Sequence, residues 1–414
     1  MKKYLVTPPK GGVVKGEISL NSSKSIANRA LIIQALTPSH FEIDNLSNAD
    51  DTVVLDKLLK STSPVLDAGA GGTTYRFLTA YLSTQEGREV VLTGSERMQE
   101  RPIGVLVDAL RALGADITYE KNEGFPPLRI KGKKLEGGSV AISAHTSSQY
   151  ISSLLMIAPT LSKGLELELV GDIVSLPYIQ MTINLMKYFG AVAKLEGHII
   201  KVEPGAYQAR PFFVEADWSA ASYYYSLAML SSEANIQLNG LDEESTQGDA
   251  EIARILNQWV STTYGENKVH LKKKAHQFTG VFQYDFLECP DLAQTVISAL
   301  ASLKIDASLQ GLKTLLIKET DRVAALNQEL GKYGVELAGS VEDNQWSLKS
   351  QNFDAQTNPI PEIQTYEDHR MAMAIAPLAL ITGNVIIAEP DVVTKSYPKY
   401  WEDLKSLGFG VVEC

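Results

Sequence analysis

Lys24, Ser25 and Arg29 are the first residues whose types and spacing could do chemistry. They stand in LNSSKSIANRALIIQAL, where small polar residues are followed at once by an apolar, helix-like run. The first turn of a helix has unpaired backbone N–H groups and a partial positive charge, to which the two basic residues would add. The pattern favours an anion site, with a capped helix and solvated basic residues as the alternative. No glycine directly precedes Lys24, so a nucleotide P-loop is disfavoured.

A glycine-rich turn is a second candidate for anion binding. The segment DAGAGGTTYRFLTAYL places Gly72 before another apolar run, and glycine lets backbone N–H groups approach an anion closely. Arg101, in a turn before the next helix, could reach an anion. A tight turn and a solvent-exposed arginine are the alternatives. A dinucleotide site fits poorly, because no acidic residue ends a second strand about 20 residues further on.

Uncharged polar residues stand at two further helix starts. Ser147, Ser148 and Gln149 begin an apolar helix, and Ser175 and Tyr178 flank a proline at the start of another. Hydroxyl and amide groups there can donate hydrogen bonds to ligand oxygens. Ordinary helix capping is the alternative, because serine is favoured at that position.

The C-terminal half contains the groups with acid–base capacity. Asp291 stands in ECPDLAQTV, a dense run of charges spans residues 318–322, and Arg370 ends EDHR. Such groups can transfer protons. Structural ion pairs are the alternative, with Thr320 or Asp321 as the cap of the next helix. The histidines lack the spacing of metal ligands, so no metal site is expected.

The elements that must position these residues repeat along the chain. Amphipathic helices end at Gly114, Gly190 and near Gly334, and pairs of short alternating strands follow. A degenerate copy over residues 247–272 has Ser261 in place of the stop glycine. Repeated α/β modules cannot bury their apolar faces alone, so they should stack into two similar lobes. The least regular joins predict one lobe from residues 1–21 and 217–414, with residues 22–216 inserted.

Composition limits the possible partners. The chain has 414 residues, 44% of them hydrophobic, and a formal net charge of −11. This charge opposes binding to nucleic acid or to anionic membranes. Two cysteines make no disulfide framework, and neither an export signal nor a stretch long enough to cross a bilayer is visible. These features predict a cytoplasmic protein.

The motifs together resemble a known family. In order and spacing, KSIANR, GGTTYRF, RMQERPIG, SSQY, VSLPYI, PDLAQT, KETDR, DHRMAM and KSYP are similar to the motifs of the 3-phosphoshikimate 1-carboxyvinyltransferase (EPSP synthase) family. The resemblance implies an α/β fold of two lobes, each of three βαββαβ repeats, an inside-out α/β barrel. It implies transfer of the enolpyruvyl group of phosphoenolpyruvate to the 5-hydroxyl of shikimate 3-phosphate, in the pathway to chorismate and aromatic amino acids. A monomer without metal or cofactor is expected.

The same resemblance implies roles for individual residues. Asp291 is expected to be the base on the 5-hydroxyl, and Glu319 to transfer the proton at the methylene carbon, with Lys24 as a competing candidate. The residues expected to bind shikimate 3-phosphate are Lys24, Ser25, Arg29, Ser147, Ser148, Gln149, Ser175, Tyr178, Asp291 and Lys318. Those expected to bind phosphoenolpyruvate are Lys24, Gly72, Arg101, Gln149, Arg322, Arg370 and Lys395.

The chain departs from the family pattern in places. The family commonly has an asparagine where this chain has Ala70 and a proline where it has Phe77, so sensitivity to the inhibitor glyphosate is left open. The related UDP-N-acetylglucosamine enolpyruvyl transferases typically have asparagine at the position of Ser25 and a cysteine in the first lobe, and this chain has neither. A non-catalytic anion-binding protein or a purely structural repeat protein would also fit parts of the pattern.

Overall fold

The computed structural model describes residues 2–144, 147–171, 173, 176–275 and 278–414. Contacts between residues divide the chain into two compact units, one of residues 22–214 and the other of residues 1–21 together with 215–414. We call them the inserted unit and the flanking unit. The chain passes between them at Asn21–Ser22 and Val214–Glu215. Among the described residues, no helix combines the length and the apolar character needed to cross a bilayer.

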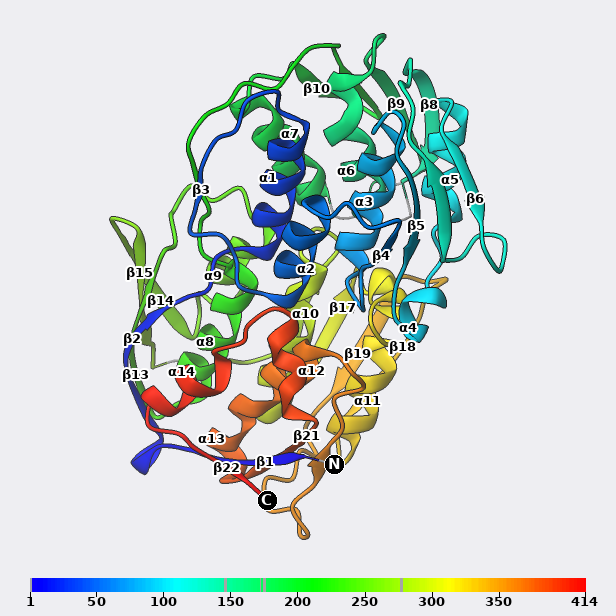
Figure 1. Ribbon diagram of the computed structural model, residues 1–414. Coiled ribbons are helices and arrows are strands. Elements are labelled where there is room, and N and C mark those ends of the chain that lie inside the picture. Colours follow the sequence, from blue (N-terminus) through cyan, green and yellow to red (C-terminus); the bar gives the residue numbers. More distant parts are fainter. Residues whose placement is uncertain (1, 145–146, 172, 174–175, 276–277) are drawn as a thin grey trace. The chain divides into compact units, whose positions relative to one another are not determined.

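The inserted unit combines packed helices with small sheets (Figure 1). Its described strands form sheets of order β4-β5-β7-β6 and β10-β11-β9-β8 and a parallel pair, β12-β3. The helices are α1 (Lys24–Leu36), α2 (Asp50–Leu59), α3 (Gly72–Ser83), α4 (Glu96–Gln99), α5 (Gly104–Ala112), α6 (Ser148–Ile157) and α7 (Leu176–Tyr188). The strands are β3 (Ile43–Asp44), β4 (Val65–Asp67), β5 (Glu89–Thr93), β6 (Asp116–Tyr119), β7 (Leu128–Lys131), β8 (Gly138–Ser143), β9 (Leu165–Val170), β10 (Ala193–Glu196), β11 (Ile199–Val202) and β12 (Phe212–Phe213).

The flanking unit repeats this plan with sheets of order β14-β15-β13-β2, β16-β17-β19-β18 and β20-β21-β1-β22. The helices are α8 (Trp218–Leu230), α9 (Ile252–Ile255), α10 (Ala293–Ser302), α11 (Arg322–Gly331), α12 (His369–Ile375), α13 (Ala379–Thr382) and α14 (Tyr400–Ser406), with 3₁₀ turns η3 (Gly248–Glu251), η4 (Pro290–Leu292) and η7 (Pro390–Lys395) among others. The strands are β1 (Lys3–Thr7), β2 (Val13–Ser19), β13 (Glu233–Asn239), β14 (Val260–Gly265), β15 (Lys268–Lys273), β16 (Phe282–Asp285), β17 (Ala307–Gln310), β18 (Glu336–Ser340), β19 (Gln345–Lys349), β20 (Glu362–Ile363), β21 (Val385–Ala388) and β22 (Gly410–Glu413). The predicted two-lobe α/β architecture is confirmed.

The predicted helix stops are confirmed at the backbone. Gly114, Gly190 and Gly334 have φ angles of 99°, 87° and 83°, a conformation that side chains with a Cβ rarely adopt. After Gly190 the chain forms β10 and β11, which pair antiparallel around a turn. The helix-stop-strand pattern in the sequence therefore corresponds to real modules.

The predicted module over residues 247–272 is wrong in detail. Ser261 does not end a helix but lies inside β14, and the helical part is divided between η3 and the four-residue α9. Pairing decides this, because every residue of β14 is opposite a residue of β15. The strand therefore begins earlier than the helical periodicity suggested.

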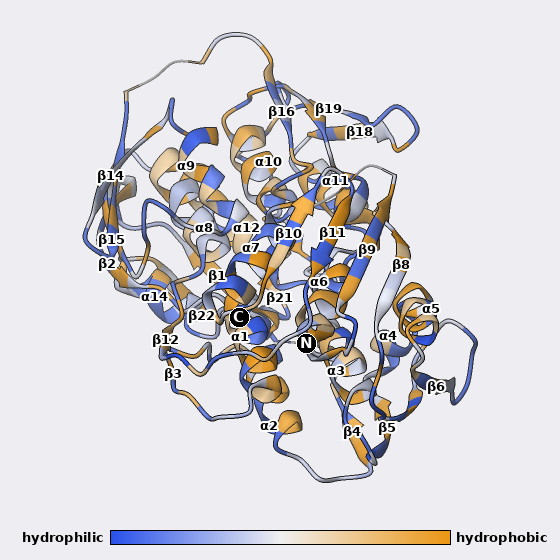
Figure 2. Ribbon diagram, turned by 90° about the horizontal axis from the view of Figure 1, so that it is seen from above, coloured by the Kyte–Doolittle hydropathy of each residue, from blue (hydrophilic) through white to orange (hydrophobic). Residues whose placement is uncertain are grey.

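Each unit has its own hydrophobic core. β9, with the sequence LELELV, alternates buried leucines with exposed residues, and Figure 2 shows this strand in both hydrophobic and hydrophilic colours. In α6, nine of the ten residues are buried, and burying a leucine or isoleucine fully is worth about 1.5–3 kcal/mol. Helices anchored in this way hold their first turns, and the polar residues there, in fixed positions.

Candidate active site

Most of the residues singled out in the inserted unit lie at the first turns of four helices. Lys24 opens α1, Gly72 opens α3, Ser147 caps α6, and Tyr178 lies in the first turn of α7. These turns have unpaired N–H groups and partial positive charge, which favour anions. Ser175 lies outside the described residues. The unit thus carries several anion-attracting ends of buried helices.

Lys24 is paired with a carboxylate that the sequence did not single out. Lys24 Nζ lies 3.1 Å from Asp51 Oδ2, and the two side chains are 18% and 7% exposed. Thr74 Oγ1 donates to the Asp51 carbonyl (2.7 Å), which ties α2 to α3. The acidic pair Asp50–Asp51 at the start of an apolar helix was the signal that could have found it. Asp51 orients Lys24 and offsets part of its charge.

Arg29 is buried among neutral groups. Its Nε donates to Thr182 Oγ1 (2.7 Å), its Nη1 to the Ser25 carbonyl (2.8 Å) and its Nη2 to Ser152 Oγ (3.0 Å). Its guanidinium lies 5.4 Å from the centre of the Phe77 ring. Burial lowers the pKa of Arg29 to about 10, so the group stays charged at neutral pH. The side chain is 2% exposed. Arg29 therefore attracts an anion through the electrostatic field of its charge more than through direct hydrogen bonds from its N–H groups.

Two guanidinium groups lie against the start of α3. A Cβ built on Gly72 would lie 2.6 Å from Arg101 Nη1 and 2.8 Å from Arg76 Nη1. Arg76 Nη1 donates to Gln149 Oε1 (2.5 Å), and Gln149 Nε2 donates to Thr73 Oγ1 (2.9 Å). Arg76 and Thr73 were not among the predicted binding residues. Only a residue without a side chain leaves room for both arginines at this helix end.

The serines at the start of α6 have the local role that serine usually has there. Ser147 Oγ accepts a hydrogen bond from the Gln149 backbone N–H (3.3 Å), which confirms the capping alternative for Ser147. Ser148 is 8% exposed. Capping does not use up the capacity of the hydroxyl, because Ser147 Oγ can still donate its own proton to a ligand oxygen.

In the flanking unit, Arg322 is held by three carboxylates. Its Nε donates to Asp368 Oδ2 (2.7 Å), its Nη1 to Asp291 Oδ1 (2.9 Å) and its Nη2 to Glu319 Oε2 (2.9 Å). Burial disfavours the charge of Arg322, but Asp368, Glu319 and Asp291 outweigh it, so the pKa of Arg322 is raised above its ordinary value. Arg322 therefore remains charged and fixes the two candidate acid–base carboxylates.

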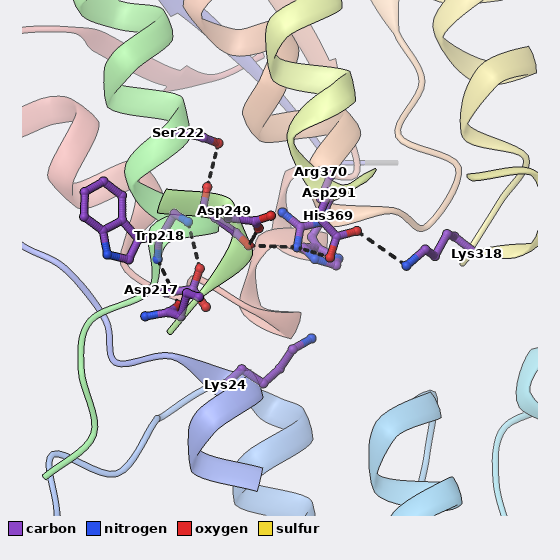
Figure 3. A network of polar contacts seen from close by, with 12 residues as sticks. Lys24, Asp217, Trp218, Ser222, Asp249, Asp291, Lys318, His369 and Arg370 are labelled. Atoms are coloured by element: carbon purple, nitrogen blue, oxygen red, sulfur yellow. Dashed lines mark hydrogen bonds and ion pairs between the residues drawn. The ribbon is translucent and has the colours of Figure 1, made fainter. Parts of the chain in front are cut away.

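Asp291 faces further cations besides Arg322. Its Oδ2 lies 3.0 Å from Arg370 Nη2, and its Oδ1 lies 3.6 Å from Lys318 Nζ (Figure 3). Its side chain is 14% exposed. Burial lowers the pKa of Lys318, while Asp291 raises it and Arg322 lowers it further. A carboxylate oriented by three cations and still accessible can accept the proton of a ligand hydroxyl.

Glu319 is shared between two cations. Its Oε2 accepts from Arg322, and its Oε1 lies 3.4 Å from Lys395 Nζ. The side chains of Glu319 and Lys395 are each 16% exposed. The adjacent Asp321 caps α11 by accepting from the Ala324 N–H (3.0 Å), which confirms one of the two caps proposed from the sequence.

Several members of this cluster were missed by sequence reasoning. Asp368 belongs to the EDHR run that the sequence singled out, but its pairing with Arg322 was not predicted; it caps α12 and accepts from Arg322. Tyr223 and Ser219 accept hydrogen bonds from Arg370 (3.2 and 3.3 Å), and Ser219 donates to Asp249. Tyr223, Ser219 and Asp249 are far from Arg370 in the sequence, and no local pattern marks them.

The two units offer complementary chemistry. The inserted unit provides helix starts, amide and hydroxyl donors and a buried cation for anions. The flanking unit provides cations paired with carboxylates. The cations can exchange a protein carboxylate for a ligand anion, and the carboxylates can transfer protons. Within the described part of the chain, no cluster of three or more His, Cys, Asp or Glu residues is arranged to hold a metal ion.

Comparison with known proteins agrees with this chemistry. The family model for EPSP synthase (3-phosphoshikimate 1-carboxyvinyltransferase) matches residues 55–404. A protein of Bacteroides fragilis strain YCH46 named 3-phosphoshikimate 1-carboxyvinyltransferase is 48% identical over 411 residues, which cover 99% of this chain and 98% of that protein. A Sulfurovum protein of the same name is 35% identical over 428 residues, covering 95% and 97%.

A solved structure supports the fold independently. EPSP synthase from Acinetobacter baumannii superimposes with a TM-score of 0.80 over 100% of both chains, at 19% sequence identity. Identity this low supports the fold alone, while the family match and the 48% identical relative carry the assignment. The chain belongs to the EPSP synthase (3-phosphoshikimate 1-carboxyvinyltransferase) family.

Proposed function

We propose that this chain transfers the 1-carboxyvinyl group of phosphoenolpyruvate to the 5-hydroxyl of shikimate 3-phosphate and releases phosphate. The observation that carries the proposal is the 48% identity, over nearly the whole chain, to a relative named for this reaction. The polar clusters of both units support it, because each substrate bears a phosphate and a carboxylate, and the clusters supply cations and helix starts for such groups.

Shikimate 3-phosphate is bound mainly by residues of the inserted unit. The buried charge of Arg29 and the helix starts at Lys24 and Ser148 favour its phosphate. Asp291 and Lys318 of the flanking unit bind the hydroxyl side of the ring. The full set is Lys24, Ser25, Arg29, Ser147, Ser148, Gln149, Ser175, Tyr178, Asp291 and Lys318.

Phosphoenolpyruvate is bound by guanidinium and ammonium groups. Arg101 lies against Gly72 at the start of α3, and Arg322 and Arg370 can exchange a protein carboxylate for the carboxylate or phosphate of the substrate. The full set is Lys24, Gly72, Arg101, Gln149, Arg322, Arg370 and Lys395.

The reaction proceeds by addition and elimination. Glu319 delivers a proton to the methylene carbon of phosphoenolpyruvate, with Lys24 as the competing donor, and C2 becomes electrophilic. The 5-hydroxyl adds to C2 as Asp291 takes its proton. The methyl group of the resulting intermediate then loses a proton, the C2–O bond to phosphate breaks, and the new enol ether double bond forms. The surrounding cations stabilise the negative charge that is transferred to phosphate.

A release assay tests the proposed function. Purified protein with phosphoenolpyruvate should liberate phosphate only when shikimate 3-phosphate is present, and mass spectrometry should detect 5-enolpyruvylshikimate 3-phosphate. Phosphate release that depends on UDP-N-acetylglucosamine instead would assign the chain to the related transferases. The proposal would be overturned if neither acceptor supported phosphate release. It would also be overturned if the protein bound both substrates without turnover.

Gly72→Ala should weaken binding of phosphoenolpyruvate in particular. The new Cβ would lie 2.6 Å from Arg101 Nη1 and force the guanidinium away from its position. We expect KM for phosphoenolpyruvate to rise about tenfold or more, because misplacing a binding group by about 1 Å is costly, and KM for shikimate 3-phosphate to change less than threefold.

Gly205→Ala is the matched control for this substitution. No atom lies within 4 Å of a Cβ built there, so steady-state kinetics should be unchanged. An unchanged KM for phosphoenolpyruvate in Gly72→Ala would argue against the role of Gly72 and Arg101.

We also propose that the protein acts as a monomer in the cytoplasm, where a membrane retains its multiply charged substrates. Sedimentation velocity at micromolar concentration checks the oligomeric state. A single species near 45.2 kDa is expected.

A further inference from the structure

Asp249 is a buried acid in η3 of the flanking unit that the proposed reaction does not use. It is 4% exposed. One of its oxygens, Oδ2, accepts a hydrogen bond from Ser219 Oγ. The other, Oδ1, is buried without a hydrogen-bond partner among the described residues. Burying a carboxyl group with one oxygen left without a hydrogen bond lowers the stability of the fold. We therefore expect Asp249 to have a functional role, which depends on the contacts around it.

Asp249 is linked to Arg370 through one intermediate side chain, that of Ser219. Ser219 Oγ donates to Asp249 and accepts from Arg370 Nη2 at 3.3 Å. The same Nη2 lies 3.0 Å from Asp291 Oδ2, and Figure 3 shows Asp249, Arg370 and Asp291 in one line of contacts. A hydroxyl has one proton. Because Ser219 gives it to Asp249, the lone pairs of Ser219 are left for Arg370.

We propose that Asp249 is a positioning residue that, through the Ser219 hydroxyl, holds the Arg370 guanidinium in the orientation that binds phosphoenolpyruvate. The inference rests on the proposed function for the identity of the ligand. Asp249 contacts Ser219 rather than Arg370, and thus acts through another side chain. Tyr223 supports the same guanidinium from a second side, accepting from Nη1 at 3.2 Å.

The ionised form of Asp249 holds Ser219 more strongly than the protonated form, because hydrogen bonds to a charged acceptor are stronger. Burial, followed by the charge of Asp291, raises the pKa of Asp249 to about 7, while Arg370 and Ser219 lower it and Asp217 raises it. Cys289, also nearby, is neutral there because burial raises its pKa to about 12. The strength of the Ser219 bond therefore changes near neutral pH.

The kinetic test compares wild type with Asp249→Asn, Ser219→Ala and the double variant. At pH 8, each single substitution should raise KM for phosphoenolpyruvate about three- to tenfold and change KM for shikimate 3-phosphate less than twofold. The double variant should be no worse than the more affected single variant, because both remove one pathway of support. Asp242→Asn, an exposed acid before the same turn, is the control and should behave as wild type.

The pH profile distinguishes positioning from a merely structural role. In wild type, KM for phosphoenolpyruvate should fall as pH rises through about 7, in step with ionisation of Asp249. Asp249→Asn should lose the part of this pH dependence that comes from ionisation of Asp249. Ionisation of phosphoenolpyruvate itself should affect KM equally in the wild type and the variant. An identical profile in the two proteins, additive effects in the double variant, or equal loss of affinity for both substrates would overturn the inference.

A readout without substrate separates this inference from the proposed function. The pKa of Asp249 is about 7 in the folded protein against an ordinary value of 3.8, so the folded protein retains a proton that the unfolded chain has lost. Stability is therefore lost as pH rises from about 4 to about 7. Asp249→Asn should raise the Tm more at pH 8 than at pH 4, even if the protein has no transferase activity. An equal effect at both pH values would contradict the buried, ionising Asp249 on which the inference depends.

Discussion

Asp291→Asn should lower kcat by about 10²- to 10⁴-fold, the range typical for loss of a general acid or base. The amide keeps the size of the side chain and one oxygen, which can accept from either Arg322 or Arg370; these lie 2.9 and 3.0 Å from different oxygens of the Asp291 carboxylate. It cannot take a proton from the 5-hydroxyl. KM for either substrate should therefore change less than about threefold, since binding contacts are largely retained.

Steady-state kinetics with both substrates varied, together with Asp291→Ala, test this assignment. The alanine variant should lose turnover far more than ligand affinity. Glu288→Gln, an exposed acid three residues away, should have wild-type kinetics. Parallel loss of turnover and affinity in Asp291→Asn would remove Asp291 as the base and leave it a binding residue.

Arg322→Met should lower the free energy of unfolding by about 3–5 kcal/mol, the usual effect of removing one partner from a buried ion pair. Arg322 is 2% exposed, and Asp368, which it binds through Nε at 2.7 Å, is 0% exposed. Removing the cation leaves Asp368, Asp291 and Glu319 as mutually repelling carboxylates. Transferase activity should be lost as well, because both candidate acid–base groups lose their orientation.

Urea unfolding at low and high salt measures the effect. Lys349→Met is the control, because its ion pair with Glu336 spans 3.3 Å between side chains that are 63% and 58% exposed. It should lower the free energy of unfolding by less than about 1 kcal/mol, and salt should abolish that difference. The Arg322 effect should persist in salt, since buried pairs are screened little. An Arg322→Met effect as small as that of Lys349→Met would show that the cluster does not stabilise the fold.

Local features of the fold were predictable because they depend on near neighbours in the chain. The stops at Gly114, Gly190 and Gly334 follow from the backbone conformation that ends a helix, and the caps at Ser147 and Asp321 follow from side-chain hydrogen bonds within one turn. Ser261, which was predicted to end a helix and lies inside β14, shows the limit of this reasoning. Ser261 lies in a strand because β14 pairs with β15. The helical periodicity of the sequence contains no information about this pairing.

The candidate site was predictable in its residue types and less so in its contacts. Asp291, Arg322 and Arg370 stood out because charged side chains interrupt apolar helix starts. Their hydrogen-bond partners could not be assigned, because Asp368 is 46 residues from Arg322 and Ser219 is 151 residues from Arg370. Likewise Arg29 is held by Ser152 and Thr182, 123 and 153 residues away.

The sequence by itself determined the family, the modular α/β plan and the residues that can do chemistry, because each depends on residue types in a short and ordered stretch of chain. Only the tertiary structure decided which partner each charge has. Packing of distant helices places Asp51 on Lys24, three carboxylates on Arg322 and the Ser219–Asp249 pair on Arg370. The physical reason is that a buried charge must be compensated wherever folding places it, and the compensating group need not be near in sequence.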